Sequence, residues 1–384
     1  MLSCCRVARY CRSDGHDLKK LATILAIFAL GLVCKSQAYA DILLGVAGPL
    51  SGQYASLGQQ MLVGAQAAVD AINAKGGVAG QNLRIMSLDD GCDNRQAEDV
   101  AQKLVEAQAS GVIGHYCSNA ALAAAKIYEK AGVVMLAPVA SLPALTSSGL
   151  SNVVRLAARD DMQGAFAASR ISQKRATARI ALLIDGTSAN KAIAASFVAA
   201  LGKPPALVLE FKPDTPDFSD MIAKMKSENI DVAYFACGAS DAGHISAQAA
   251  KADLKMLRYG PDALVSDLFG QAAGPASEGM LASFPVDPLL AVQSRSVVAA
   301  LKLAGQSGDG AALPAYAAVQ SFAAGAAATN GANGAAIAAW LKSGQSIDTV
   351  EGPLTFDKNG DATPVRFSWY VWINGGYQAL PDGN

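Results

Sequence analysis

A phenol, a thiol and a hydroxyl stand side by side at one predicted turn of this 384-residue chain, as Tyr116, Cys117 and Ser118. They lie between an apolar run and an alanine-rich run in the stretch VIGHYCSNAALAAAKIY, Val112 to Tyr128. Such a change of pattern predicts a strand that turns into a helix. A serine at this place can cap the helix, and a helix N-terminus favours an anion. The turn is therefore a candidate anion-binding site.

A second hydroxyl follows the next predicted strand, in the segment APVASLPAL. Ser141 stands before a possible helix start, and Pro143 would lie just inside it, where its missing N–H is tolerated. Open parallel sheets bind ligands beyond the carboxyl ends of their strands. Ser118 and Ser141 together therefore predict a carboxylate-binding pair, although each serine alone is also typical of an ordinary helix cap.

The first forty residues have the pattern of a secretory signal peptide. Basic residues precede the apolar run LATILAIFALGLV, and the small-residue sequence AYA comes directly before Asp41. The apolar run is short for a transmembrane helix, so an uncleaved anchor is the weaker alternative. We expect residues 1–40 to be removed from an exported protein.

Export changes the interpretation of the seven cysteines, since three of them, Cys92, Cys117 and Cys237, lie beyond residue 40. Cys92 and Cys117 each follow a predicted strand. If these strands are parallel neighbours, the two turns meet at one sheet edge, and we expect a Cys92–Cys117 disulfide. Closing a loop of about 25 residues would add ~3 kcal/mol. Cys237 is left as a buried free thiol, and without a CxxC or a histidine pair we expect no metal site and no cofactor.

Strands and helices alternate along the chain beyond residue 40. Predicted strands include ILLGVAGPL, NLRIMSLDD, GVIGH and GVVMLAPV, and the alternation pauses near Arg155 before a second series begins with ARIALLID. This order is typical of right-handed βαβ units around parallel sheets. The tail FSWYVWINGGYQAL predicts a hairpin with a turn at Gly375 and Gly376. The fold class is therefore α/β, with a second α/β domain of similar design after the first.

The composition and motifs argue against several classes of function. The formal net charge is −1, so the chain lacks the basic surface that nucleic-acid binding needs. His115 and His244 are the only histidines beyond residue 40, and no G-x-S-x-G motif occurs, so we expect no enzyme. DKNGD, starting at Asp357, lacks the later Gly and Glu of a calcium loop and predicts a turn between strands. Trp369 and Trp372 are expected to pack inside a lobe.

Four segments together resemble the leucine/isoleucine/valine-binding protein family, the periplasmic substrate-binding subunits of branched-chain amino acid ABC transporters. They read GPLSGQYASLGQQMLVGAQAAVDAINAKGGVAGQNLRI, DDGCDNRQAEDVAQKLV, VIGHYCSNAALAAAKIYEKAGVVMLAPVAS and GPLTFDKNGDA. The resemblance implies the type I periplasmic binding protein fold, in which three crossovers join two doubly wound α/β lobes around the ligand. It assigns residues 41–159 and 287–362 to lobe 1, and residues 160–286 and 363–384 to lobe 2.

The resemblance also implies which residues hold the ligand. The serine directly after the disulfide cysteine and the turn after the next strand hold the carboxylate, which here means Ser118, the backbone of Val139, and Ser141. An acidic residue after Gly-Pro receives the ammonium, and YGPD places Asp262 there. A glutamate is usual at this position, so the ligand would sit deeper or a water would bridge the gap.

The side-chain pocket departs from the family pattern. Positions that are commonly aromatic match Leu57, Ala189, Gly238 and Ala311, while Tyr116 replaces an aliphatic residue beside the serine. We therefore expect an enlarged pocket that takes a branched-chain or larger apolar amino acid. A carboxylate without an amino group, such as an aromatic acid, and a ligand sensor on the same fold stay open as alternatives. The resemblance implies a periplasmic monomer whose partners are a small-molecule ligand and the membrane permease.

Overall fold

The computed structural model describes residues 41–331, 333–364 and 367–380. The predicted signal peptide, residues 1–40, lies outside the described residues. The chain from Asp41 onward forms one compact unit that contains three sheets.

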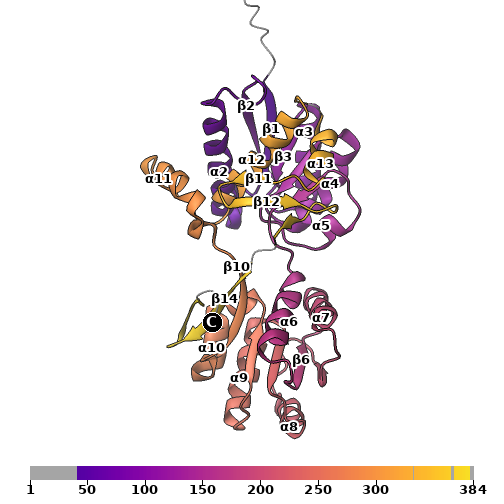
Figure 1. The fold of residues 1–384 in the computed structure, drawn as a ribbon, viewed down its shortest axis with the longest axis vertical. Helices are drawn as coiled ribbons and strands as arrows, with labels where there is room; N and C mark the ends of the chain where they lie inside the picture. The colour runs from indigo at the N-terminus through magenta and orange to yellow at the C-terminus, as the bar shows by residue number, and fades with distance from the viewer. Residues whose placement is uncertain (1–40, 332, 365–366, 381–384) are drawn as a thin grey trace, which may run out of the picture. The chain divides into compact units, whose positions relative to one another are not determined.

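The first sheet is parallel throughout, in the order β2-β1-β3-β4-β5. Its strands are β1 (Ile42–Gly48), β2 (Leu83–Asp89), β3 (Gly111–Gly114), β4 (Val134–Ala137) and β5 (Val153–Arg155). The connecting helices are α2 (Ala55–Asn73), α3 (Asn94–Glu106), α4 (Ser118–Ala131) and the short α5 (Ala144–Ser147). Two later helices, α12 (Ala312–Ala328) and α13 (Gly334–Leu341), also cover this sheet (Figure 1).

Alternation along β1 explains how both faces of the first sheet are covered. Leu44 and Val46 belong to the apolar cluster with α2, α12 and α13. Leu43 and Ala47 belong to the opposite cluster, with α3 and α4. Because successive side chains of a strand point to opposite faces, a strand between two helical layers is apolar at every position. Every residue of β1 is indeed buried.

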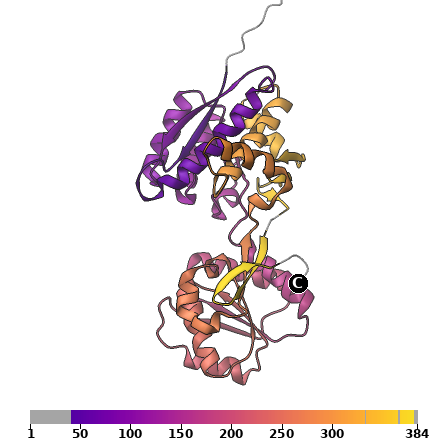
Figure 2. The ribbon, with the colours of Figure 1, turned by 90° about the vertical axis from the view of Figure 1, so that its left-hand side faces the viewer.

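The second sheet has the order β15-β14-β10-β9-β8-β6-β7. Its parallel strands are β6 (Ile180–Ile184), β7 (Leu207–Glu210), β8 (Val232–Ala236), β9 (Leu257–Gly260) and β10 (Leu281–Pro285). The tail adds an antiparallel hairpin, β14 (Phe367–Ile373) and β15 (Gly376–Ala379), as its sequence predicts. Helices α6 (Met162–Lys174) and α7 (Ser188–Leu201) pack on one face of this sheet. Helices α8 (Ser219–Ser227), α9 (Ala239–Lys251) and α10 (Asp267–Ala273) pack on the other face (Figure 2).

The third sheet is a short antiparallel one, β11 (Ile347–Thr349), β12 (Gly352–Phe356) and β13 (Ala362–Thr363), and its side chains join the core of the first sheet. DKNGD forms the turn between β12 and β13, where Asp357 accepts three backbone N–H groups. The remaining elements are helix α11 (Arg295–Leu303) and the 3-10 turns η1 (Gly52–Tyr54), η2 (Asp262–Leu264), η3 (Gly274–Ser277), η4 (Pro288–Leu290) and η5 (Val292–Ser294).

The structure confirms the α/β fold class and the packing role of the two tryptophans. Trp369 lies in the core with α6 and α7, and Trp372 lies in the core with α9 and α10. Cys237 is buried and free. Burial, with smaller contributions from Asp185 and Asp241, raises the pKa of its thiol well above the ordinary value. Such a thiol is inert at neutral pH.

Gly64 lets α2 approach α12 closely. A Cβ at this position would lie 1.8 Å from the carbonyl oxygen of Ala312. A backbone carbonyl inside a helix cannot swing aside, so the two helices would have to separate. Because α12 brings the later part of the chain back to the first sheet, this contact couples two distant segments.

We expect Gly64→Ala to lower the free energy of unfolding by about 2 kcal/mol or more, through overpacking of α2 against α12. Urea unfolding of the protein comprising residues 41–384 measures this. Gly376→Ala is the matched control, since its added Cβ meets nothing within 4 Å, and we expect a change within about 0.5 kcal/mol. Equal midpoints for the two variants would contradict the close approach of the helices.

Candidate ligand-binding site

One cavity of about 750 Å³ is lined by three of the polar residues that the sequence singles out, Tyr116, Ser141 and Asp262, but not by Ser118. Its walls come from the turns after β3 and β4, the segment after β5, the turn after β9, the segment after β10, and the region around β12 and β13. Apolar residues such as Pro138, Leu156, Phe284 and Phe367 make up much of the lining. An apolar cavity with a few polar groups is typical of small-molecule sites.

Ser118 does not cap α4, contrary to the prediction. It is the first residue of the helix, and Cys117 takes the N-cap position without a side-chain hydrogen bond. The Ser118 hydroxyl oxygen instead accepts the backbone N–H groups of Ser141, at 3.1 Å, and Leu142, at 3.3 Å. The reason is that the turn after β4 presents two N–H groups that need an acceptor. The two predicted serine positions therefore do lie together.

Ser141 does not cap a helix either. The short α5 begins after Pro143, with no side-chain cap. The Ser141 hydroxyl donates to the carboxylate of Asp160 at 2.9 Å, and the Asp160 N–H donates to the Ser141 carbonyl at 3.3 Å. A hydroxyl has one proton but two lone pairs. In this arrangement Ser141 offers a ligand its lone pairs, while its backbone N–H faces Ser118.

Asp262 lies at the cavity wall, at the start of η2, directly after β9. The side-chain amide of Gln163 donates to its carboxylate at 3.0 Å and accepts the Asp262 N–H at 2.8 Å. The Ser283 hydroxyl donates to the same Gln163 oxygen at 2.7 Å. Gln163 lines the cavity but is only 1% exposed, so a nearly buried amide holds the Asp262 carboxylate in place.

Acidic side chains dominate the charge of the cavity. The lining contains Asp160, Asp262, Asp287 and Glu351, but no lysine or arginine among the described residues. Burial raises the pKa of Asp160 above its ordinary value, and the charge of Asp262 raises it further, while the hydrogen bond from Ser141 acts against both. A negative cavity of this kind attracts cationic groups.

The cavity gathers only part of the predicted set. Tyr116, Val139, Ser141 and Asp262 line it. Leu57 lies in α2, Ala189 in the first turn of α7, and Gly238 directly before α9, and none of the three lines the cavity. Ala311 is buried before α12, and its neighbour Gly310 lines the cavity instead.

Asp185 links the turn that leads to Ala189 with the turn that contains Gly238. Its carboxylate accepts from the side chain of Asn190 at 2.8 Å and from the backbone N–H of Gly238 at 3.1 Å. It therefore joins the turns after β6 and β8. Ala189 and Gly238, which the sequence predicts to bind the ligand, are therefore held by these two turns and not by the cavity lining.

Sequence reasoning missed Asp160 and Gln163. The segment ARDDMQG did point to an acidic site, because two adjacent aspartates follow the break in the strand–helix alternation near Arg155. Asp161 pairs with Arg159 at 2.5 Å, so only Asp160 of the two is free to line the cavity. Which of two adjacent acids pairs with the nearby arginine depends on tertiary packing, so the sequence could not single out Asp160.

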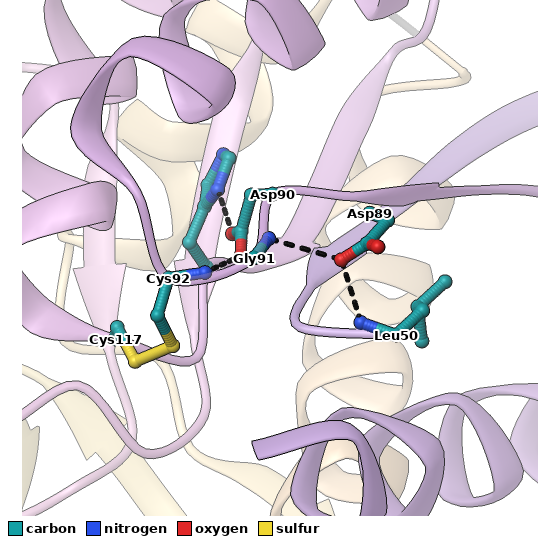
Figure 3. The surroundings of a disulfide bond; sticks show 7 residues. Leu50, Asp89, Asp90, Gly91, Cys92 and Cys117 are labelled. Carbon is teal, nitrogen blue, oxygen red and sulfur yellow. Dashed lines mark hydrogen bonds and ion pairs between the residues drawn. A yellow bond between two sulfur atoms is a disulfide. The ribbon is translucent and has the colours of Figure 1, made fainter. Parts of the chain in front are cut away.

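The disulfide between Cys92 and Cys117 is present, as predicted (Figure 3). The reasoning about its strands was wrong, because β2 and β3 are not neighbours: both pair with β1, which lies between them. The carboxyl ends of all three parallel strands still meet at one edge. The disulfide therefore joins the turns on either side of the end of β1.

A buried polar network supports the turns that the disulfide joins. The carboxylate of Asp90 accepts the Cys92 N–H at 2.8 Å and lies 2.6 Å from His115 Nδ1. His115 Nε2 lies 3.0 Å from the hydroxyl of Tyr128. Asp90, His115 and Tyr128 are fully buried, which keeps them from contact with a ligand. The histidine therefore has a structural role.

Asp89 adds a second contact between turns at the same edge. Its carboxylate accepts the Leu50 N–H at 2.8 Å and the Gly91 N–H at 2.9 Å, which ties the segment after β1 to the turn after β2 (Figure 3).

Within the described ranges, no group of histidine, cysteine, aspartate or glutamate side chains could hold a metal ion. The same residues contain no helix of the length and apolarity that crossing a membrane requires.

Two doubly wound α/β units and an apolar cavity with fixed polar groups define a small-molecule binding protein of the periplasmic type. The family model for periplasmic binding proteins matches residues 41–376, and the chain belongs to this family. The Leu/Ile/Val-binding protein of Escherichia coli strain K12 is 37% identical over 336 residues, covering 86% of this chain and 91% of that protein.

Two solved structures show the same fold. A substrate-binding protein of an ABC transporter from Desulfitobacterium hafniense, in complex with Leu, has a TM-score of 0.70 at 24% identity, covering 88% of this chain and all of that one. A solute-binding protein from R. palustris, in complex with benzoate, has a TM-score of 0.61 at 21% identity, covering 88% and 95%. These relatives are binding proteins of transporters and not enzymes.

Thiol titration of the unfolded, unreduced protein comprising residues 41–384 should give one equivalent, from Cys237, because Cys92 and Cys117 are bonded. Prior reduction should raise the titre to all three cysteines and lower the free energy of unfolding by about 3 kcal/mol. Cys237→Ala is the control, and it should show no free thiol before reduction. A titre of three without reductant would contradict the disulfide.

Proposed function

We propose that this protein is the substrate-binding subunit of an ABC transporter, which captures an amino acid in the periplasm and delivers it to the membrane permease. The ligand is a branched-chain or larger apolar amino acid. The 37% sequence identity to the Leu/Ile/Val-binding protein, which extends over most of both chains, supports this class of protein. The observation that carries the amino-acid assignment is the Asp262 carboxylate, fixed at the cavity by a buried glutamine.

The carboxylate of the ligand binds at the turns after β3 and β4. The N–H groups of Ser141 and Leu142 donate to the Ser118 hydroxyl in the free protein. A ligand carboxylate takes over such donors, with the backbone at Val139 beside them and the Ser118 hydroxyl turned to donate. Hydrogen bonds to a charged acceptor contribute ~1.5–3 kcal/mol each, more than the neutral bonds they replace.

The ammonium of the ligand binds at Asp262. A carboxylate that is enclosed with a ligand and lacks a cationic partner is costly, by several kcal/mol. A ligand ammonium removes this cost, and the Ser141 lone pairs can accept one of its protons. Glutamate is usual in the family, and aspartate keeps the charge with a shorter reach.

Two alternative functions remain. The fold also occurs in a protein solved with benzoate, and the apolar lining would suit an aromatic acid. However, such a ligand would bring a negative charge into a cavity that has four acids and no basic side chain among its described lining. This charge balance favours an amino acid. A ligand sensor on the same fold would bind the ligand in the same way but pass the signal to a regulator.

Closure of two lobes places the remaining predicted residues against the ligand. We assign residues 41–159 and 287–362 to lobe 1 and residues 160–286 and 363–384 to lobe 2. Hinge closure of this kind is common in periplasmic binding proteins. It would bring Leu57, Ala189 and Gly238 to the ligand side chain. The protein works as a monomer, without nucleic acid.

A thermal-shift screen of amino acids and their deaminated acids on the mature protein tests the proposal. A ligand at 100 times its Kd stabilises the folded state by ~2.7 kcal/mol, so binders stand out clearly. A rise in melting temperature with apolar amino acids supports the assignment as the amino-acid-binding subunit of a transporter. Shifts confined to aromatic or aliphatic acids would overturn the amino-acid assignment.

At least one apolar amino acid larger than leucine, such as phenylalanine, should bind as well as leucine does. The reason is that small residues at Ala189 and Gly238 leave room where the family commonly has aromatic rings. Titration calorimetry with both amino acids measures this. Gly238→Phe should refill the pocket and weaken the binding of phenylalanine more than the binding of leucine. Tight leucine binding by the wild type, without measurable phenylalanine binding, would contradict the enlarged pocket.

Asp262→Asn should weaken amino-acid binding by about tenfold or more, since ~1.4 kcal/mol corresponds to a factor of ten. The change keeps the shape and the contact with Gln163 but removes the charge. The matched control is Asp287→Asn, another cavity aspartate, which should change affinity much less. Equal losses for leucine and for its deaminated acid would show that Asp262 is structural.

A further inference from the structure

The turn that carries Asp262 is short and needs anchors outside itself. Asp262 is the first residue of η2, which has three residues and follows β9 directly. Inside the turn, the Leu264 N–H donates to the Pro261 carbonyl at 3.1 Å, and the Val265 N–H donates to the Asp262 carbonyl at 2.9 Å. These bonds close the turn, but they do not tie it to the rest of the second sheet. A binding group whose position is fixed in advance loses less freedom when the ligand arrives.

Trp372 holds the end of this turn, as Gln163 holds its start. The indole N–H of Trp372 donates to the Leu264 carbonyl at 2.8 Å, although the two residues are 108 positions apart in the chain. Leu264 is fully buried and Trp372 is 3% exposed, so water does not compete for this bond. An indole has a single N–H donor, and a buried carbonyl that loses its donor is costly. The bond therefore fixes η2 to β14.

The indole ring of Trp372 is itself fixed by packing. It contacts Phe269 of α10 and Tyr377 of β15, and the ring centroids are 5.3 Å apart in both pairs. Gly270 of α10 makes room for the ring, since a Cβ at this position would lie 2.6 Å from Trp372 Cη2. A close-packed ring keeps its orientation, so its N–H continues to point at the turn.

Strand β14 also acts on the site from the other face of the second sheet. Trp369 of β14 stacks on Phe166 of α6 at 5.0 Å and meets the edge of Tyr259 of β9 at 5.5 Å. Phe166 follows Gln163 by three residues in α6. Tyr259 comes three residues before Asp262. Trp369 therefore packs between the two elements that bear the contact of the amide with the carboxylate.

Strand β10 lies between β14 and β9 and completes the arrangement. Ser283 of β10 is the register partner of Trp369, and its hydroxyl donates to the Gln163 side-chain oxygen at 2.7 Å. On the opposite face, β10 contributes the small Ala282 to the cluster that contains Trp372. A small side chain at this place allows the indole to reach past β10 to the turn after β9.

We propose that Trp372 is a positioning residue for recognition of the ligand ammonium, and that β14 thereby sets the affinity of the site for amino groups. This inference rests on the proposed function, in which Asp262 receives the ammonium. Trp372 is not among the described residues that line the cavity, so its effect on a ligand passes through Asp262. Loss of the indole N–H should therefore weaken amino-acid binding while Asp262 carries its charge, and should have little effect once that charge is removed.

Two double-mutant cycles test this, by titration calorimetry with leucine on the protein comprising residues 41–384. Trp372→Phe keeps an aromatic ring but removes the N–H, and it should weaken leucine binding by about fivefold or more. In the Asp262→Asn background, the same change should cost less than about twofold. Ser118→Ala acts at the carboxylate end, so its loss of affinity and that of Trp372→Phe should multiply.

The matched control is Trp340→Phe in α13. Trp340 packs against the core of the first sheet, so this variant should bind leucine as the wild type does. Benzothienylalanine in place of Trp372 keeps the shape of the ring and exchanges the N–H for a sulfur atom. It should weaken leucine binding as Trp372→Phe does, which separates the lost N–H from any loosening of the core by the smaller ring. Melting temperatures of the free variants verify that each is folded.

The outcomes separate the inference from the function on which it rests. If the wild type does not bind leucine, or if Asp262→Asn binds it equally well, the proposed amino-acid function fails. If Asp262→Asn binds leucine weakly while both replacements of Trp372 bind it like the wild type, Trp372 has no part in recognition. If Trp372→Phe costs as much in the Asp262→Asn background as in the wild type, its effect does not pass through Asp262, and the inference is wrong.

Discussion

A buried guanidinium sets the position of the whole site. Arg155 ends β5, is fully buried, and donates to Asp361 at 2.5 Å and to the Leu142 carbonyl at 2.7 Å. It thereby joins the end of the first sheet to the turn between β12 and β13 and to the turn after β4. A buried ion pair adds little net stability, but the loss of one partner costs ~3–5 kcal/mol. This asymmetry makes the pair a strict constraint on where the chain leaves the sheet. Asp160 follows Arg155 by five residues, and this fixed path of the chain brings its carboxylate into contact with Ser141.

The other turns at this edge are fixed by covalent and polar contacts rather than by packing alone. The Cys92–Cys117 disulfide and the Asp90–His115 contact hold the turns after β2 and β3, and the Ser118 hydroxyl holds the turn after β4. Ligand groups lie beyond the ends of the strands, where no helix or sheet restrains the backbone. Such contacts take the place of that restraint, so the N–H groups of the turn after β4 are held in position before any ligand binds. On the second sheet, Gln163 does the same for Asp262.

The sequence predicted the fold class, the disulfide and four of the cavity residues, because each depends on local pattern or chain order. Apolar periodicity is enough to alternate strands and helices. It cannot predict sheet order, so the sequence did not reveal that β1 lies between β2 and β3. The two serines show the same limit. The sequence showed that both serines follow a strand and lie close to a helix start. A hydroxyl, however, bonds to a strong partner that lies close in space, and here those partners are 23 and 19 residues away in the chain. Asp160 was missed for the same reason, since its role depends on which arginines are already paired.

The unequal charge of the two ends of the site determines which ligands it distinguishes. Neutral N–H and hydroxyl donors hold a carboxylate, but they can turn to water or to one another when no ligand is present. In the proposed site the Asp262 carboxylate, held by the neutral amide of Gln163, still has no cationic partner among the described cavity lining. An apolar pocket separates side chains that differ by one methylene by only ~1–3 kcal/mol. Discrimination between compounds with and without an ammonium is therefore stricter than discrimination between side chains. The proposed function therefore implies a cavity that selects for the backbone of an amino acid and tolerates side chains of different size.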